Sequence, residues 1–275
     1  MTFSMTRALV RSAILLCVVF VSYEQPLNAN SEPTQGNKER YANTGSEGTV
    51  TGKTLFDGEP PIRTKIDETQ DANCAAIARN QRTENVIVTS GKLANVFVYV
   101  KGGSLDRYSF EAPQTPVVLD QRLCRFVPHM LGIQTGQTLL IFNSDPTTHN
   151  VHPAPRVNEE WNQTQAQRAP PLEKKFSRPE VLFAVKCNQH PWMKAYVGVL
   201  AHPFFAVSAK DGSFKIAGLP AGDYALVAWH ETLGEQTTNI SIGPNESKSV
   251  DFVFNPKSKA SSRSLLRTED ALVIR

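Results

Sequence analysis

The sequence predicts an all-β protein made of two β-sandwiches. Short runs rich in β-branched and aromatic residues recur along the chain, and clusters of turn residues separate them. The clearest of these runs are 94–100, 138–142, 181–187 and 196–200. Helical periodicity is nearly absent, and the length of 275 residues is enough for one large or two small domains.

The first 29 residues have the organisation of a secretory signal. Arg7 and Arg11 precede an apolar run over 12–23, and a small-residue cleavage site follows at 27–29. The run is short for a bilayer span, so we expect export to the periplasm or cell surface. An uncleaved anchor, which would associate the protein with a membrane, is the alternative. Residues 30–47 are polar without periodicity, which predicts a flexible linker.

Between residues 48 and 112 the pattern is one of strands joined by turns. Residues 48–56 are strand-like, and 57–61 carry turn chemistry. Residues 73–80 are compatible with a short helix. The run 94–100 predicts a strand that ends before a Lys-Gly-Gly sequence.

Residues 113–202 read almost entirely as strands and turns, with a long polar excursion over 153–175. Extended segments are expected at 117–119, 125–133, 138–142, 181–187 and 196–200. Side chains alternate between the two faces of a strand, so Phe183, Val185 and Cys187 share one face. The Cys187 thiol is therefore expected to point into the core.

Residues 203–254 contain short strands at regular spacing, with a tight-turn signal at Asp211-Gly212. This pattern is typical of a further β-sandwich. Residues 255–275 are rich in Lys, Arg and Ser, and we expect a polar, solvated tail. The formal net charge is only +3, with no basic stripe of interleaved aromatic residues, which argues against a nucleic-acid partner.

A metal-binding pattern follows the strand at 181–187. Cys187, His190 and Met193 have a Cys-x2-His-x2-Met spacing. A thiolate, an imidazole and a thioether suit copper, whereas Met is a poor ligand for zinc. A second imidazole is needed, and the candidates are His129, His149, His152 and His202.

The cysteine count bears on the same site. Removal of the signal leaves three cysteines, an odd number for an exported protein. The simplest arrangement is a disulfide between Cys74 and Cys124, with Cys187 committed to the metal. An oxidising compartment permits that disulfide.

Residues 115–201 resemble the cupredoxins, most closely their amicyanin and plastocyanin branch. The resembling residues are Gly136-Gln137, Asn143, the His-Asn-Val-His run at 149–152, and the Cys-x2-His-Pro-x-Met loop at 187–193. The resemblance implies a Greek-key cupredoxin domain over 113–202 with one type 1 (blue) copper per chain. The implied ligands are His149, Cys187 and His190, with Met193 as a weak axial ligand.

The same resemblance assigns roles to the neighbours of these ligands. Asn150 matches a position that ties the two ligand loops together. His190, with Pro191 and Trp192 beside it, is expected near the surface as the port through which electrons pass.

Residues 211–224 resemble the carboxypeptidase-regulatory, transthyretin-like sandwich, a likeness that concerns fold and not chemistry. The usual opening strands of that fold are matched by the N-terminal region. We therefore expect a discontinuous sandwich over 48–112 and 203–254, with the cupredoxin domain inserted. The alternative is that 48–112 adds strands to the cupredoxin.

These observations predict an exported copper protein that carries single electrons between redox protein partners of the cytochrome or dehydrogenase kind. An enzyme is not expected. The Trp229-His230-Glu231 run has no adjacent nucleophile or second carboxylate, and no His-x-His cluster could build a trinuclear copper centre. The alternatives are a periplasmic copper carrier or storage protein, and a cell-surface structural module with a vestigial site.

Overall fold

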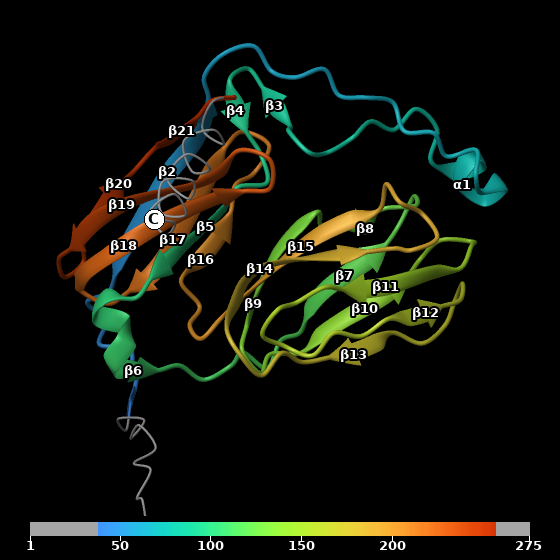
Figure 1. Ribbon diagram of the computed structural model, residues 1–275. Helices are drawn as coiled ribbons and strands as arrows, with labels where there is room; N and C mark the ends of the chain where they lie inside the picture. The colour runs from blue at the N-terminus through green and yellow to red at the C-terminus, as the bar shows by residue number, and fades with distance from the viewer. Residues whose placement is uncertain (1–37, 257–275) are drawn as a thin grey trace, which may run out of the picture. The chain divides into compact units, whose positions relative to one another are not determined.

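The computed structural model describes residues 38–256 and consists mainly of β-strands (Figure 1). The all-β prediction is confirmed. Over this range the only helices are α1 (Ala72–Ile77) and a short 3-10 helix, η1 (Gly103–Arg107), and none is long and apolar enough to cross a membrane. The predicted signal at 1–29 and nearly all of the predicted tail lie outside the described residues.

One pair of sheets, here called the central sandwich, is formed by the middle of the chain. Its four-stranded sheet has the order β13-β10-β7-β8, and its five-stranded sheet has the order β12-β11-β14-β15-β9. The strands are β7 (Val117–Gln121), β8 (Phe126–Val127), β9 (Met130–Gln134), β10 (Leu139–Asn143), β11 (His149–Pro153), β12 (Gln163–Gln165), β13 (Leu172–Lys174), β14 (Glu180–Lys186) and β15 (Lys194–Leu200). Buried apolar side chains of both sheets form one cluster between them, and this cluster includes Cys187 and Met193.

A second pair of sheets, the flanking sandwich, combines strands from before and after the central one. β5 pairs with β16 and β18, while β2 pairs with β4, β17, β20 and β21. The strands are β2 (Gly48–Phe56), β3 (Val88–Thr89), β4 (Lys92–Leu93), β5 (Phe97–Lys101), β16 (Phe205–Val207), β17 (Ser213–Leu219), β18 (Gly222–His230), β19 (Gly234–Ile242), β20 (Ser247–Ser249) and β21 (Phe252–Phe254). The strands from 48–101 therefore share sheets with those from 205–254.

The end of the predicted linker is structured. β1 (Glu39–Arg40) pairs in parallel with β6 (Tyr108–Ser109). The ring of Tyr41 packs against Tyr108 and Phe110, with centroid separations of 5.0 and 5.3 Å. The linker prediction is therefore wrong for residues 38–41. Aromatic contacts anchor a segment whose polar composition predicts no structure.

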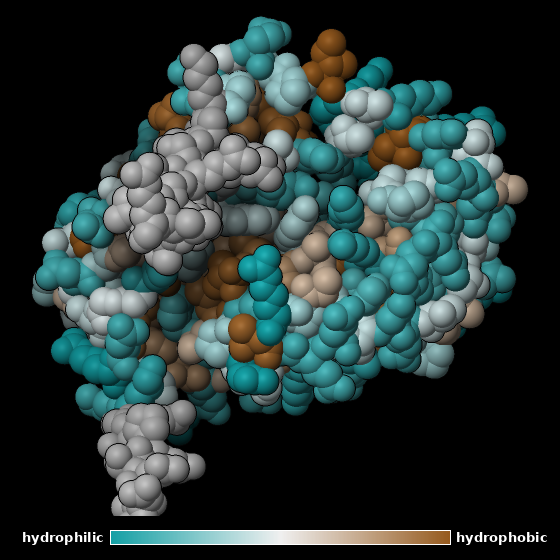
Figure 2. Space-filling model, in the orientation of Figure 1, coloured by the Kyte–Doolittle hydropathy of each residue, from teal (hydrophilic) through white to brown (hydrophobic). Residues whose placement is uncertain are grey.

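Apolar packing also occurs between the two sandwiches. Phe97 and Tyr99 of β5, Met130 of β9 and Leu200 of β15 belong to one buried cluster. The visible face of the molecule, in contrast, is largely hydrophilic with separate hydrophobic residues among the polar ones (Figure 2). Over residues 38–256, the buried apolar side chains form three clusters.

The segment that carries α1 is covalently tied to the central sandwich. Cys74 of α1 and Cys124 of the β7–β8 turn form a disulfide with a Cα–Cα distance of 5.7 Å. Asp71 caps the helix by accepting hydrogen bonds from the N–H groups of Asn73 and Cys74. A helix of six residues is marginal by itself, so the cap and the disulfide are what hold α1 in place.

Candidate metal centre

Three of the predicted ligands meet at one end of the central sandwich. His149 begins β11, Cys187 directly follows β14, and His190 lies in the loop before β15. The two imidazole Nδ1 atoms are 2.8 Å apart, and the Cys187 Sγ lies 3.6 Å from the Nδ1 of His190. All three side chains are at most 3% exposed, and their ligand atoms lie within 4.8 Å of one another.

Met193 closes the loop that contains two of these ligands. Its N–H donates to the carbonyl of His190 over 2.9 Å, and its own carbonyl accepts from the N–H of Cys187 over 3.3 Å. Its side chain is buried in the same apolar cluster as Cys187. The loop therefore holds itself closed around the thiol.

The other candidate imidazoles lie outside this cluster. His129 contacts Glu231, and His152 bonds to Glu160 over 2.7 Å. The Nδ1 of His202 accepts from the backbone N–H of Phe204. Of the four candidate histidines, His149 is the one that lies beside Cys187 and His190.

Asn150 connects the two ligand-bearing segments. Its side-chain oxygen accepts from the backbone N–H of Asn188 over 2.5 Å. Its own backbone N–H lies 3.5 Å from the Cys187 Sγ, to which it donates. One residue thus ties the strand of His149 to the loop of Cys187 and His190.

Two carboxylates that the sequence interpretation missed hold the imidazoles. The Nε2 of His149 lies 2.9 Å from Asp145, and the Nε2 of His190 lies 3.2 Å from Asp71. A carboxylate partner fixes the tautomer of a metal-binding imidazole and raises its basicity. With each Nε2 donating a proton to its carboxylate, each Nδ1 is available as a metal ligand.

The spacing of Asp145, four residues before His149, could have suggested its role. No such signal exists for Asp71, which is 119 residues away from His190 in the chain.

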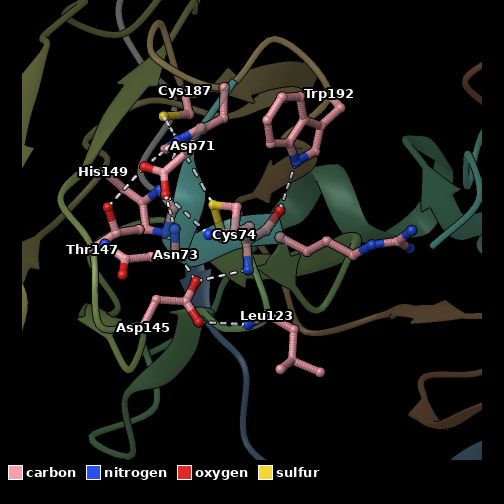
Figure 3. The surroundings of a disulfide bond; sticks show 12 residues. Asp71, Asn73, Cys74, Leu123, Asp145, Thr147, His149, Cys187 and Trp192 are labelled. Carbon is pink, nitrogen blue, oxygen red and sulfur yellow. Dashed lines mark hydrogen bonds and ion pairs between the residues drawn. A yellow bond between two sulfur atoms is a disulfide. The ribbon is translucent and has the colours of Figure 1, made fainter. Parts of the chain in front are cut away.

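The disulfide joins the two cysteines whose backbone N–H groups bind these carboxylates (Figure 3). Asp71 accepts from the N–H of Cys74 over 2.9 Å, and Asp145 accepts from the N–H of Cys124 over 2.7 Å. The Sγ of Cys74 is itself 3.8 Å from the Nε2 of His190. The two imidazoles are thus positioned by groups that one covalent bond joins.

The structure contradicts the expected electron port at His190. This imidazole is 3% exposed and is covered by Asp71 and Cys74. Trp192 packs on it with a centroid separation of 5.1 Å, and its indole N–H donates to the carbonyl of Cys124. The prediction failed because only the disulfide brings the segment with Asp71 over this edge of the site.

The charges of the three ligands are coupled. Burial alone lowers the pKa of His149, but its contacts with Asp145 and the Cys187 thiolate outweigh burial and raise the pKa to about 9. Burial alone raises the pKa of Cys187, but hydrogen bonds from His149 and the Asn150 backbone hold it below its usual value. Burial, followed by the charge on His149, lowers the pKa of His190.

Without metal, the raised pKa of His149 favours a proton on its imidazole, and the Nδ1 atoms of His149 and His190 lie within hydrogen-bond distance at 2.8 Å. Two imidazole nitrogens and the Cys187 sulfur converge here, so the donor set fits a cation. Thiolate and imidazole donors suit copper.

No family model and no curated protein matches the chain. Among solved structures, a copper-containing nitrite reductase from Thermus scotoductus SA-01 is 21% identical, covering 32% of this chain and 23% of its own, with a TM-score of 0.30. A reduced amicyanin mutant is 22% identical, over 32% of this chain and 86% of its own, with a TM-score of 0.28.

A purple cupredoxin from Nitrosopumilus maritimus is 19% identical, covering 30% of this chain and 98% of its own, with a TM-score of 0.26. The chain thus spans less than a quarter of the nitrite reductase. Similarities this weak do not establish what the protein does.

Metal affinity is expected to increase with pH. His149 has a raised pKa of about 9 in the metal-free centre, so below that pH its proton must leave before Nδ1 can bind a metal. The apparent Cu(I) affinity should therefore rise about tenfold per pH unit between pH 6 and 8, and level off above about pH 9. Competition with a chromophoric Cu(I) chelator measures this slope. A pH-independent affinity would contradict the protonated His149.

Substitution of Asp71 should weaken the centre without unfolding α1. Asn also caps helices well, so Asp71→Asn keeps the cap but removes the negative charge beside His190. Cu(II) affinity should fall about 10- to 100-fold, as is typical for partners of ligating histidines. Cu(I) affinity should fall less, because the lost charge favoured the more highly charged ion.

Competitive titration with each ion measures both affinities. Asp67→Asn is the matched control, since Asp67 is exposed in the same segment and its side chain bonds to Thr69. Unchanged binding by Asp71→Asn, or equal losses in both variants, would rule out this role.

Proposed function

We propose that the central sandwich is a cupredoxin domain with one type 1 copper and that the protein carries single electrons. The observation that carries this proposal is the convergence of a buried thiolate and two Nδ1 atoms, with each imidazole held by a carboxylate. Thiolate and two imidazoles, with Met193 as a weak axial ligand, match the ligand set of blue-copper electron-transfer centres.

The chain's own residues supply rigidity. Bound copper would provide a Cu(I)/Cu(II) couple able to hold or release one electron. The strands β11, β14 and β15 fix the backbone on both sides of the ligands, and Asn150 joins the two ligand segments. Burial of the donors keeps water away from them. A ligand set that cannot rearrange favours transfer of an electron over ligand exchange.

The remaining parts of the proposal rest on the sequence. The signal-like start of the chain supports export to the periplasm or cell surface, and a cytochrome or dehydrogenase-like protein is the expected partner. We assign the flanking sandwich to the transthyretin-like class, as a docking or anchoring module. Its strands come from both sides of the central sandwich, as an inserted cupredoxin domain requires.

A copper carrier or storage protein is the second candidate. Its support is the covering of His190 by Asp71 and Cys74, since an enclosed ligand set slows metal release. The two functions differ in whether the bound ion exchanges electrons readily.

Cu(II) added to residues 30–275 should give an intense blue thiolate-to-copper band that disappears on reduction. Cys187→Ser should abolish the band, because the structure has no other free thiol among the described residues. His152→Ala, which removes an imidazole outside the cluster, should retain it. A colourless chain that binds Cu(I) tightly would favour the carrier, and a chain without copper binding would contradict both candidates.

A further inference from the structure

The turn between β7 and β8 has an unusual composition. Arg122 and Arg125 exchange backbone hydrogen bonds of 2.9 and 3.3 Å around the two residues Leu123 and Cys124. These two have φ values of 54° and 51°, in the left-handed region that usually favours Gly or Asn in such turns. Leu123 is also 48% exposed. Strained backbone of this kind occurs most often at functional sites, and here it presents an apolar side chain to solvent.

The turn lies next to both imidazoles of the metal centre. The N–H groups of Leu123 and Cys124 donate to Asp145 over 2.6 and 2.7 Å, and Asp145 bonds to His149. The carbonyl of Cys124 accepts from Trp192, whose ring packs on His190. Figure 3 shows the Leu123 side chain directed away from His149, while its backbone lies next to Asp145. One intervening side chain therefore links each imidazole to this turn.

Positive charge without a carboxylate partner surrounds the turn. Arg63, Arg82 and Arg122 form no ion pair within residues 38–256, whereas Arg125 pairs with Glu84. The guanidinium groups of Arg63 and Arg82 donate to backbone carbonyls, which leaves their charges uncompensated.

These side chains line one hollow with two exposed apolar residues. We call this the hairpin surface and define it by Arg63, Arg82, Arg122, Leu123 and Val127. Leu123 and Val127 are 48% and 46% exposed. Exposed apolar side chains beside charged ones are common where proteins associate transiently. The positive charge of the three arginine residues is complementary to a partner with acidic side chains.

We propose that the hairpin surface is where an acidic electron-transfer protein docks and where electrons enter and leave the metal centre. This inference rests on the proposed electron-transfer function. One electron passes between the reduced centre and the oxidised partner, and no atom or proton is exchanged. The covering of His190 supports the assignment, because the edge of the site that would otherwise meet a partner is closed.

The surface can be mapped without copper. Hexacyanochromate(III) is a redox-inert, paramagnetic trianion, so it broadens amide resonances near the place where it binds. In the metal-free chain it should broaden Arg122, Leu123 and Val127 selectively, and Arg82→Gln/Arg122→Gln should remove the effect. Arg122→Gln alone, a milder change, should weaken it. Arg178→Gln is the charge-matched control, because this exposed arginine follows β13, at the opposite edge of the sheet from β8.

Kinetics then test the route of the electron. At low salt, hexacyanoferrate(III) should oxidise the Cu(I)-loaded protein about tenfold more slowly in Arg82→Gln/Arg122→Gln than in the unchanged sequence. The rate should be unchanged in Arg178→Gln. The difference between the variants should shrink at high salt, because salt screens the charges. Oxidation by the trication tris(phenanthroline)cobalt(III) should not slow.

Unselective broadening, or equal rate losses in Arg178→Gln and the double variant, would overturn the proposal. A chain without a blue band would refute the proposed function alone, because the mapping measurement does not depend on copper.

Discussion

The disulfide between Cys74 and Cys124 is the constraint on which the candidate metal centre depends. It holds a six-residue helix that could not persist alone, and it anchors the turn whose N–H groups bind Asp145. Through Asp71 on one side and Asp145 on the other, the same bond positions both imidazoles. The ligands come from the central sandwich, but their orientation depends on a segment that precedes it in the chain.

This arrangement combines rigidity with restricted access. Asp71 and Cys74 cover His190, which keeps this imidazole away from solvent. The β7–β8 turn remains as the nearby surface, and Cys124 connects it to the disulfide, to Asp145 and to Trp192. The disulfide thus helps to cover His190 and also shapes the β7–β8 turn, where we propose that electrons enter and leave.

Much of the site could be predicted because its residues lie close together in the chain. Cys187, His190 and Met193 share one loop, and alternation along β14 indicates that the thiol faces the core. His149 required the family resemblance, since spacing alone left four histidines open. Asp71 could not be predicted, because its contact with His190 depends on tertiary placement of a polar segment. Most strands could be predicted from their β-branched and aromatic residues. β1 could not, because its pairing with β6 is accompanied by contacts between aromatic rings that are distant in the sequence.

The most direct test of this account is the access of water to the bound metal. Paramagnetic relaxation of solvent protons should be measured for the Cu(II)-loaded protein and for Cys74→Ala/Cys124→Ala, with circular dichroism to confirm that the sheets persist. We expect little relaxation enhancement in the intact protein and a clear increase in the variant. Equal enhancement in the two would show that the disulfide does not close the site.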